Sequence, residues 1–337
     1  MILRYKKRWL ITGVAGFIGS NLLETLLVHN QKVVGIDNFV TGSKQNLELI
    51  KKKIASDKWN NFKFIKGNIE NEEICKHGCK NIDYVLHQAA IGSVPRSIKD
   101  PITTNKSNVT GFLNLITAAK NAKVEKFIYA SSSSVYGDNL NLPKIEKKIG
   151  NALSPYAFTK QINETYASIF SKLYGLKCVG LRYFNVFGKN QNPNGAYAAV
   201  IPRWILNMIN NKRVTIFGDG NTTRDFCFIE NVVQANISAA TRYKSLNEVY
   251  NVANGNQISL NDLFYEIKKN LKENGIIYDK QPEYLPFRSG DIRYSLANIN
   301  KIKKNLKYKP LYNFKNGIKK LIPWYIGRKN FYKINND

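Results

Sequence analysis

Residues 8–19 read RWLITGVAGFIG, a short apolar run that leads into the glycine triplet Gly13, Gly16 and Gly19. Leucines follow at helical spacing over residues 22–27. A strand, a tight glycine turn and a helix form the dinucleotide-binding unit, whose glycines allow the turn, the approach of a pyrophosphate and close helix packing. Because the N-terminus of such a helix faces the phosphates, we expect this stretch to bind a dinucleotide.

An acidic residue ends the second expected strand, residues 32–36. Asp37, followed by Asn38, comes roughly twenty residues after the glycines. A carboxylate at this position accepts hydrogen bonds from the adenosine ribose hydroxyls and would repel a 2′-phosphate. We therefore predict NAD rather than NADP as the cofactor.

Further apolar runs alternate with helical patterns, which predicts an α/β protein with a doubly wound parallel Rossmann sheet. We expect residues 1–183 to form mainly the NAD-binding domain. Residues 184–337 mix short elements and loops, and we expect a smaller mixed lobe for substrate that interleaves with the first domain. The expected strands are residues 8–12, 32–36, 62–66, 83–87, 126–130 and 176–182, and a helix is expected over 105–122.

Composition narrows the class of protein. The 337 residues are 43% hydrophobic, no apolar run reaches the ~20 residues that span a bilayer, and the charged N-terminus does not resemble a signal peptide. The net charge of +27 comes from lysines spread along the chain, without a nucleic-acid-binding motif. We expect a cytoplasmic protein with no nucleic-acid partner and no stable membrane insertion. Residues 318–329, both apolar and basic, should pack on the protein's own core.

The cysteines and His87 do not suggest a metal site. Cys75 and Cys79 flank His77, but this spacing fits no common zinc pattern and no second ligand pair follows. We expect reduced thiols and no metal. His87 ends an expected strand, and we predict a packed side chain there rather than a catalyst.

A tyrosine and a lysine share one helical face in the stretch SPYAFTK, residues 154–160. Ser154 suits the N-cap and Pro155 the first turn, so Tyr156 and Lys160 lie one turn apart. A phenol has a pKa of about 10, and a nearby ammonium favours the phenolate. We predict that Tyr156 is a general base whose pKa is lowered by Lys160.

Serines occupy residues 131–134, at the end of the fifth expected strand. Ligands of open parallel sheets bind at the carboxyl ends of the strands, where hydroxyls can bridge a substrate oxygen to Tyr156. In the second lobe, Arg224 and Arg288 are candidates for binding phosphate, because arginine suits phosphate geometry. Each could instead form a surface salt bridge.

These motifs together resemble the extended short-chain dehydrogenases/reductases, over about residues 8–326. Within that family the chain is most similar to bacterial UDP-N-acetylglucosamine 4-epimerases of surface-polysaccharide pathways, as residues 91–97 and 194–202 indicate. The motifs that carry the resemblance are Gly13-x-x-Gly16-x-x-Gly19, Asp37-Asn38, Gln88-Ala89-Ala90, the serine cluster, Tyr156-x-x-x-Lys160, residues 181–188 (LRYFNVFG) and Thr223-Arg224-Asp225-Phe226.

The resemblance implies two sets of binding residues. Asn68 departs from the family, which usually has aspartate near the adenine; asparagine can still donate and accept a hydrogen bond. The implied NAD-binding residues are Gly13, Gly16, Phe17, Ile18, Gly19, Asp37, Asn38, Gly42, Asn68, Ile69, Gln88, Ala89, Ala90, Tyr156, Lys160, Tyr183 and Val186. The implied UDP-sugar-binding residues are Ser93, Ser132, Ser133, Ser134, Tyr156, Asn185, Val200, Thr215, Phe217, Arg224, Arg288, Asp291 and Ser295.

The resemblance also implies a mechanism for the interconversion of UDP-N-acetylglucosamine and UDP-N-acetylgalactosamine. Tyr156 removes the C4 hydroxyl proton while the C4 hydride passes to NAD, and the 4-keto sugar turns before hydride returns to its opposite face. Ser132 is the first choice for the hydrogen bond to the C4 oxygen, with Ser133 and Ser134 as alternatives. Lys160 would hold the nicotinamide ribose. Family members suggest a homodimer through the helices near residues 105–122 and 155–174.

Other activities stay open on the same fold. The alternatives are a 4-epimerase of UDP-glucose or UDP-glucuronate and, with less support, a nucleotide-sugar 4,6-dehydratase or a non-catalytic dinucleotide sensor. A dehydratase needs an acid and a base where Ser133 and Ser134 stand. Alignment on residues 290–296 places Ser295 at the family's specificity position, where a small side chain admits N-acetyl sugars and a tyrosine restricts the enzyme to glucose and galactose.

Overall fold

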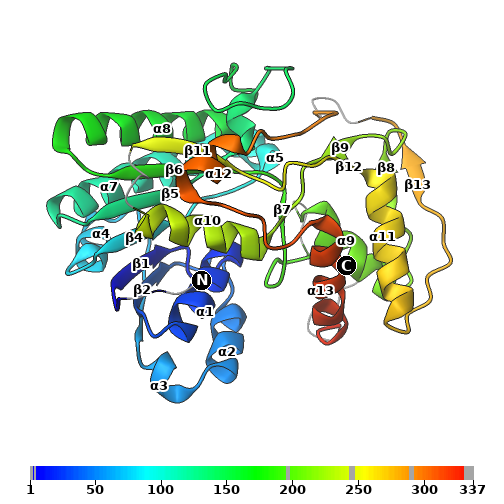
Figure 1. Ribbon diagram of the computed structural model, residues 1–337, viewed down its shortest axis with the longest axis horizontal. Helices are drawn as coiled ribbons and strands as arrows, with labels where there is room; N and C mark the ends of the chain where they lie inside the picture. The colour runs from blue at the N-terminus through cyan, green and yellow to red at the C-terminus, as the bar shows by residue number, and fades with distance from the viewer. Residues whose placement is uncertain (1–2, 4, 195–197, 243–246, 288–291, 330–337) are drawn as a thin grey trace.

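A computed structural model describes residues 3, 5–194, 198–242, 247–287 and 292–329. Its centre is a seven-stranded parallel sheet in the order β11-β6-β5-β4-β1-β2-β3 (Figure 1). This confirms the predicted α/β class and the doubly wound parallel sheet. The strands are β1 (Arg8–Thr12), β2 (Lys32–Asp37), β3 (Phe62–Lys66), β4 (Tyr84–His87), β5 (Lys126–Ser132), β6 (Cys178–Tyr183) and β11 (Glu248–Val252).

Helices cover both faces of this sheet (Figure 1). One layer holds α1 (Phe17–Val28), α2 (Lys44–Lys53) and α10 (Ile229–Thr241); the other holds α4 (Glu72–Cys79), α7 (Gly111–Asn121) and α8 (Pro155–Tyr174). Successive residues of β1 point to opposite faces, so Trp9 and Ile11 join one buried apolar cluster and Leu10 joins the other. Two cores on either side of one sheet are what a doubly wound topology requires.

Strand β11 was not among the strands expected from the sequence. It lies beyond residue 183 and pairs in parallel with β6, with Tyr250 opposite Leu181. The chain thus leaves the sheet after β6, forms part of the second lobe and returns to the sheet edge. Helix α10 likewise comes from the later part of the chain and packs on β5 and β6.

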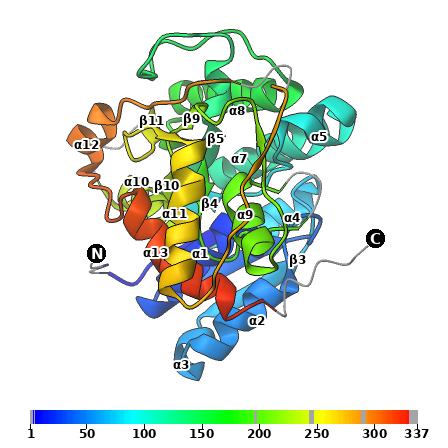
Figure 2. The same ribbon diagram turned by 90° about the vertical axis from the view of Figure 1, so that its right-hand side faces the viewer.

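The second lobe lies at the carboxyl end of the sheet, where α11 (Leu260–Glu273) packs against α9 (Val200–Ile209) and α13 (Phe314–Ile326) (Figure 2). Ile318, Leu321 and Ile322 of α13 are buried, which confirms that this basic and apolar segment packs on the protein's own core. The lobe also contains α12 (Asn300–Leu306) and the short strands β7 (Val186–Phe187), β8 (Thr215–Phe217), β9 (Thr223–Arg224), β10 (Cys227–Phe228), β12 (Ile258–Ser259) and β13 (Glu283–Leu285).

The expected helix over 105–122 is the later part of a longer helical segment and contains an irregular turn. Helices α5 (Val94–Lys99) and α6 (Pro101–Asn105) come first, the π-helical turn η1 (Lys106–Thr110) follows α6, and the segment continues as α7. Within η1, Asn108 exchanges two hydrogen bonds with the backbone of Ile91, at 2.8 and 3.1 Å. A π-turn inserts one extra residue, which lets a polar side chain point inward. The remaining short helices are α3 (Ser56–Trp59) and η2 (Ser133–Tyr136).

All four cysteines are buried free thiols, and burial raises the pKa of Cys75 and Cys79 to about 12. The described residues contain no group of three or more side chains that could hold a metal ion. No helix in the described part of the chain is both long and apolar enough to cross a membrane.

Candidate active site

The glycine turn after β1 is fitted closely to its neighbours. Gly13 has φ +69°, and a Cβ there would lie 2.9 Å from the backbone of Ala89. A Cβ on Gly19 would lie 2.1 Å from the carbonyl oxygen of Gly13. Side chains are therefore excluded at Gly13 and Gly19. Gly16 is the N-cap of α1, and its missing side chain leaves room for an anion at the N-terminus of this helix. This cradle fits the pyrophosphate of a dinucleotide.

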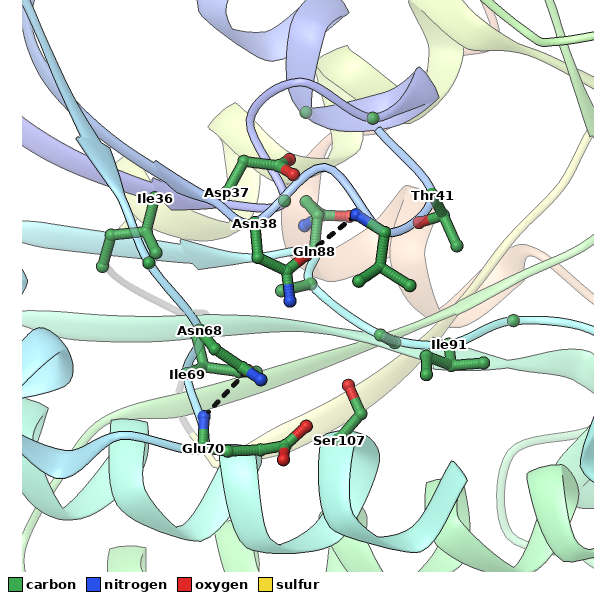
Figure 3. A pocket seen from close by; sticks show the side chains of 18 of the residues that line it. Ile36, Asp37, Asn38, Thr41, Asn68, Ile69, Glu70, Gln88, Ile91 and Ser107 are labelled. Atoms are coloured by element: carbon green, nitrogen blue, oxygen red, sulfur yellow. Dashed lines mark hydrogen bonds between the residues drawn. The ribbon is translucent and has the colours of Figure 1, made fainter. Parts of the chain in front are cut away.

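A pocket of 580 Å³ opens beside the glycine turn, at the carboxyl ends of β1, β2 and β4 (Figure 3). Asp37 and Asn38 lie on one side of it, and Asn68 and Glu70 on the other. The structure brings the following predicted cofactor residues to this pocket: Gly13, Gly16, Phe17, Ile18, Gly19, Asp37, Asn38, Asn68, Ile69, Gln88, Ala89 and Ala90. Lining residues that were not predicted include Thr41, Ile91, Lys106 and Ser107.

The Asp37 carboxylate holds the turn as well as lining the pocket. Its Oδ2 accepts a hydrogen bond from the backbone N–H of Ala15, and its Oδ1 accepts one from Phe39, both at 2.8 Å. Burial raises the pKa of Asp37, and these backbone donors act against the rise. Gly42 packs against the same carboxylate, since a Cβ there would lie 2.9 Å from Oδ1. Asp37 is thus fixed where a ribose hydroxyl can reach it.

Three side chains form a hydrogen-bonded support behind the pocket. The Tyr183 hydroxyl donates to Gln88 Oε1 at 3.0 Å, and Gln88 Nε2 donates to Asn236 Oδ1 at 3.1 Å. Tyr183 and Asn236 are buried, and only Gln88 lines the pocket. Asn236 comes from α10 and was not predicted. Val186, another predicted cofactor residue, lies in β7, away from this pocket.

Helix α8 has the bounds expected from the sequence, and Ser154 caps it by accepting the backbone N–H of Ala157 at 3.1 Å. Lys160 is buried, and its Nζ donates to the carbonyl oxygen of Ala130 at 2.9 Å. The same Nζ lies 5.9 Å from the centre of the Tyr156 ring. Burial lowers the pKa of Lys160 to about 8. The predicted juxtaposition of Tyr156 and Lys160 is present.

Burial and Ser132 act on the pKa of Tyr156 in opposite directions. Burial raises the pKa of Tyr156, and a hydrogen bond with Ser132 acts against this rise. The Lys160 Nζ donates to a carbonyl oxygen of β5, and a lowering of the Tyr156 pKa by the Lys160 charge stays a prediction.

The four serines have different surroundings. Ser132 ends β5, donates to the Ser134 hydroxyl and accepts the Ser134 backbone N–H, each at 3.1 Å. Ser133 and Ser134 begin the turn η2. Ser131 donates to Glu164 Oε1 at 2.5 Å. Ser132 is the serine that acts against the rise in the pKa of Tyr156.

The second lobe contains a separate pocket of 410 Å³. It gathers five predicted substrate residues from distant parts of the chain: Asn185, Val200, Thr215, Phe217 and Arg224. Two further arginines that were not predicted also line it, Arg203 of α9 and Arg293 after β13. The predicted residues Arg288 and Asp291 lie outside the described residues. Ser295 is half-buried, two positions after Arg293.

A third cavity, of 530 Å³, adjoins the glycine turn. Ser93 and Arg96 line it together with Gly16, Phe17 and Gly42. Ser93, a predicted substrate residue, has φ +98° and caps α5. A non-glycine residue at such a φ is strained, which is a frequent property of ligand-binding turns.

His87 is a packed strand residue, as predicted. It is buried at the end of β4, and its Nδ1 shares a hydrogen bond of 2.7 Å with the Thr12 hydroxyl. Burial lowers the pKa of His87 to about 3, so its ring is neutral.

Several known proteins are similar to this chain in sequence and fold. The UDP-N-acetylglucosamine 4-epimerase of Methanobrevibacter ruminantium, solved with UDP-N-acetylmuramic acid, is 37% identical, with a TM-score of 0.87 over 96% of this chain and 99% of that one. The UDP-glucuronic acid 4-epimerase of Bacillus cereus, solved with UDP-glucuronic acid and NAD, is 32% identical, with a TM-score of 0.83 over 95% of this chain and 99% of that one.

The sequence relatives agree with the structural ones. A putative UDP-glucose 4-epimerase of Methanocaldococcus jannaschii is 35% identical over 318 residues, which are 94% of this chain and 97% of that protein. Residues 9–253, which contain the glycine turn, the serines and the Tyr156–Lys160 helix, match the family profile. These findings confirm the resemblance drawn from the motifs, and with it NAD as the cofactor. The chain belongs to the NAD dependent epimerase/dehydratase family.

Proposed function

We propose that this protein is a UDP-sugar 4-epimerase that interconverts UDP-N-acetylglucosamine and UDP-N-acetylgalactosamine through a 4-keto intermediate. The observation that carries the reaction type is the placement of Tyr156 and Lys160 one turn apart on α8, with the Lys160 Nζ 5.9 Å from the centre of the Tyr156 ring and Ser132 at the end of β5. This arrangement provides a base, Tyr156, and a hydroxyl, Ser132, that can hydrogen-bond to a substrate oxygen. The positions that follow Ser132 hold serines, so the acid and base of a dehydratase are not available there.

The residues divide the work as follows. Bound NAD supplies reversible hydride acceptance. Tyr156 takes the proton of the C4 hydroxyl and returns it, while Ser132 orients the C4 oxygen. Lys160 contributes a positive charge that makes the phenolate more accessible, aided by the charge of an oxidised nicotinamide. The cofactor lies in the pocket of Asp37 and Asn68, with its pyrophosphate on the glycine turn.

The pocket of the second lobe suits the UDP portion. Arg203, Arg224 and Arg293 surround it and offer guanidinium groups to a diphosphate, while Phe217 offers an aromatic face to a base. By resemblance, Arg288 and Asp291 complete this site. Holding the diphosphate in this lobe leaves the sugar free to turn between the Tyr156 hydroxyl and the cofactor.

Two features favour N-acetylated sugars. Ser295 is small where the family uses tyrosine to exclude a 2-N-acetyl group. The Methanobrevibacter relative at 37% identity is a UDP-N-acetylglucosamine 4-epimerase solved with an N-acetylated nucleotide sugar. UDP-glucuronate is the second candidate, because the Bacillus cereus relative was solved with UDP-glucuronic acid and the pocket arginines could pair with a carboxylate.

The sugar is tested by incubation with UDP-N-acetylglucosamine, UDP-glucose and UDP-glucuronate in parallel, followed by chromatography of the products. We expect UDP-N-acetylgalactosamine to form without added cofactor, because NAD stays bound through the cycle. Ser295→Tyr should abolish turnover of the N-acetylated pair and spare UDP-galactose. Ser295→Ala is the matched control and should behave as the native protein. If UDP-glucuronate is converted and UDP-N-acetylglucosamine gives no product, the substrate is the alternative, UDP-glucuronate.

We also propose a homodimer through α8, one of the two predicted helices, and through α5 and α6 in place of the predicted helix near residues 105–122. Large apolar side chains are exposed along these helices, including Ile98, Ile102, Phe158 and Leu173, with exposed fractions of 56–69%. An apolar surface on adjacent helices is typical of a self-association face. Sedimentation of the native protein and of Leu173→Glu tests this, and the substitution should yield a monomer.

A further inference from the structure

A buried ion pair joins Glu164 of α8 to Arg182 of β6, one helical turn beyond Lys160. Glu164 Oε2 accepts Arg182 Nη2 at 2.7 Å, and Glu164 Oε1 accepts Arg182 Nε at 2.9 Å. Only 11% of the Glu164 side chain and 4% of the Arg182 side chain are exposed. Replacing such a pair by apolar residues often costs nothing in stability, so burial of two charges is itself weak evidence of a stabilising role. Stability alone therefore does not explain this ion pair, whose Glu164 lies near Lys160 of the proposed active site.

Glu164 continues the helical row of Tyr156 and Lys160. Residues four apart lie one turn apart on the same face, so the order along α8 is base, lysine and carboxylate. Lys160 is the central member, with its Nζ on the carbonyl oxygen of Ala130 in β5. The Glu164 charge raises the pKa of Lys160 against the lowering caused by burial. The carboxylate thus favours the ammonium form on which the proposed mechanism depends.

The same carboxylate also fixes the serine strand. Glu164 Oε1 accepts the Ser131 hydroxyl at 2.5 Å, and the next residue, Ser132, acts against the rise in the pKa of Tyr156. Ser131 and Ser132 are successive residues at the end of β5, joined by one peptide bond. Anchoring Ser131 therefore sets where Ser132 stands relative to the phenol.

Arg182 connects the ion pair to neighbouring elements of the structure. Its Nη1 donates to the carbonyl oxygen of Glu146 at 3.0 Å, and its guanidinium lies 4.9 Å from the centre of the Tyr136 ring. The Tyr136 hydroxyl in turn donates to Asn251 of β11 at 2.6 Å. The ion pair is consequently held by β5, β6, η2 and β11 at once.

Two ionisable groups that lie near Lys160 and Glu164 are neutral and do not replace this charge. His87 of β4 faces Lys160, but its pKa of about 3 makes it neutral. Tyr129 of β5 faces Glu164, and burial raises its pKa well above the ordinary value, so it is also neutral. Arg182 of β6 lies on the far side of Glu164 and opposes its effect in part.

We propose that Glu164 is a positioning residue for the reaction: through Ser131 it sets the place of Ser132 beside Tyr156, and through its negative charge it keeps Lys160 cationic. Its influence reaches the substrate only through these three residues. The assignment rests on the proposed function for its kinetic consequence, but its effect on Tyr156 can be measured without substrate.

Glu164→Gln keeps the shape of the side chain and removes its charge. We expect the acidic limb of the pH–turnover profile, which reports the Tyr156 phenolate, to move up by about one pH unit, the low end of the shifts caused by neighbouring charges. We expect kcat at neutral pH to fall about tenfold, with little change in KM. An ultraviolet difference titration between proteins with tyrosine and phenylalanine at position 156 should show tyrosinate appearing at higher pH in the Glu164→Gln background.

Loss of one partner leaves Arg182 as an unpaired buried charge, so a second variant separates folding from positioning. Glu164→Gln combined with Arg182→Met removes both charges and should recover the native unfolding temperature. If positioning is correct, the pH profile and the tyrosinate titration stay shifted in this double variant. If both return to native values, Glu164 is only structural and the proposal is overturned.

Glu24→Gln is the matched control. Glu24 is also 11% exposed and is paired with Lys53 and Lys189, at 2.5 Å each, but lies in α1 away from Tyr156. It should leave both titrations unchanged; a shift equal to that of Glu164→Gln would mean that losing any buried carboxylate has this effect. If the native protein converts no UDP-sugar, the proposed function fails, while the tyrosinate titration still decides the role of Glu164.

Discussion

The two main pockets of this protein are built in different ways. The cofactor pocket is largely a backbone cradle: glycines and strand ends surround it, and its lining residues all lie between positions 13 and 107 of the chain. The pocket of the second lobe is made by side chains from residues 185, 203, 224 and 293, which only the folded chain brings together. A backbone cradle leaves a motif in the sequence, whereas a side-chain pocket leaves scattered polar residues that look like any others.

The substitution Tyr156→Phe removes the proposed general base and should have the largest effect. Removing the phenolic oxygen deletes the general base, so kcat should fall by at least ~10²-fold. Bound NAD and UDP affinity should remain near native, because neither pocket is lined by the lost oxygen. The measurements are turnover, the NAD released on denaturation and UDP titration by calorimetry. Near-native turnover would remove Tyr156 from the mechanism; loss of bound NAD would show that the pockets are not independent.

Features that depend on local sequence could be predicted, and features that depend on long-range packing could not. The strands, the glycine turn and the α8 bounds were predictable because period, capping and turn chemistry are local. Strand β11 was missed because its place at the sheet edge depends on pairing with β6, about seventy residues earlier. Arg203 and Glu164 were missed for the same reason. A charged residue within a helix normally faces solvent. Only the folded structure shows that Arg203 of α9 lines the lobe pocket and that Glu164 is buried against Arg182.

Asp225 provides a second test, because it anchors the lobe and not the cofactor pocket. Its carboxylate is fully buried and accepts backbone N–H groups of Asn254, Gly255 and Ala297 at 2.9–3.3 Å. Burial raises the pKa of Asp225 from 3.8 to about 6. The folded state therefore binds the proton more tightly than the unfolded state, so the free energy of unfolding falls as pH rises from about 4 to 6.

This contribution amounts to about 3 kcal/mol at most, two pKa units at ~1.4 kcal/mol each. Urea unfolding at several pH values should show a smaller fall over this range in Asp225→Asn than in the native protein. Asp219→Asn is the control: Asp219 is half-exposed and its pKa is lowered, so its substitution should not reduce that fall. Identical pH dependence in Asp225→Asn and the native protein would show that Asp225 does not titrate in this range.

The smallest expected effect concerns Arg203, which the structure alone adds to the lobe pocket. If the guanidinium binds the diphosphate, Arg203→Gln removes a charge-assisted hydrogen bond worth about 1.5–3 kcal/mol, and KM should rise about tenfold or more. The bound NAD should not change, because Arg203 does not line the cofactor pocket. Arg213→Gln is the matched control, since Arg213 is exposed in the same lobe and does not line this pocket. A rise in KM confined to Arg203→Gln would place substrate phosphate in the side-chain pocket, whereas equal effects of both substitutions would mean only that the lobe's positive charge attracts an anionic substrate, and the specific role of Arg203 would be withdrawn.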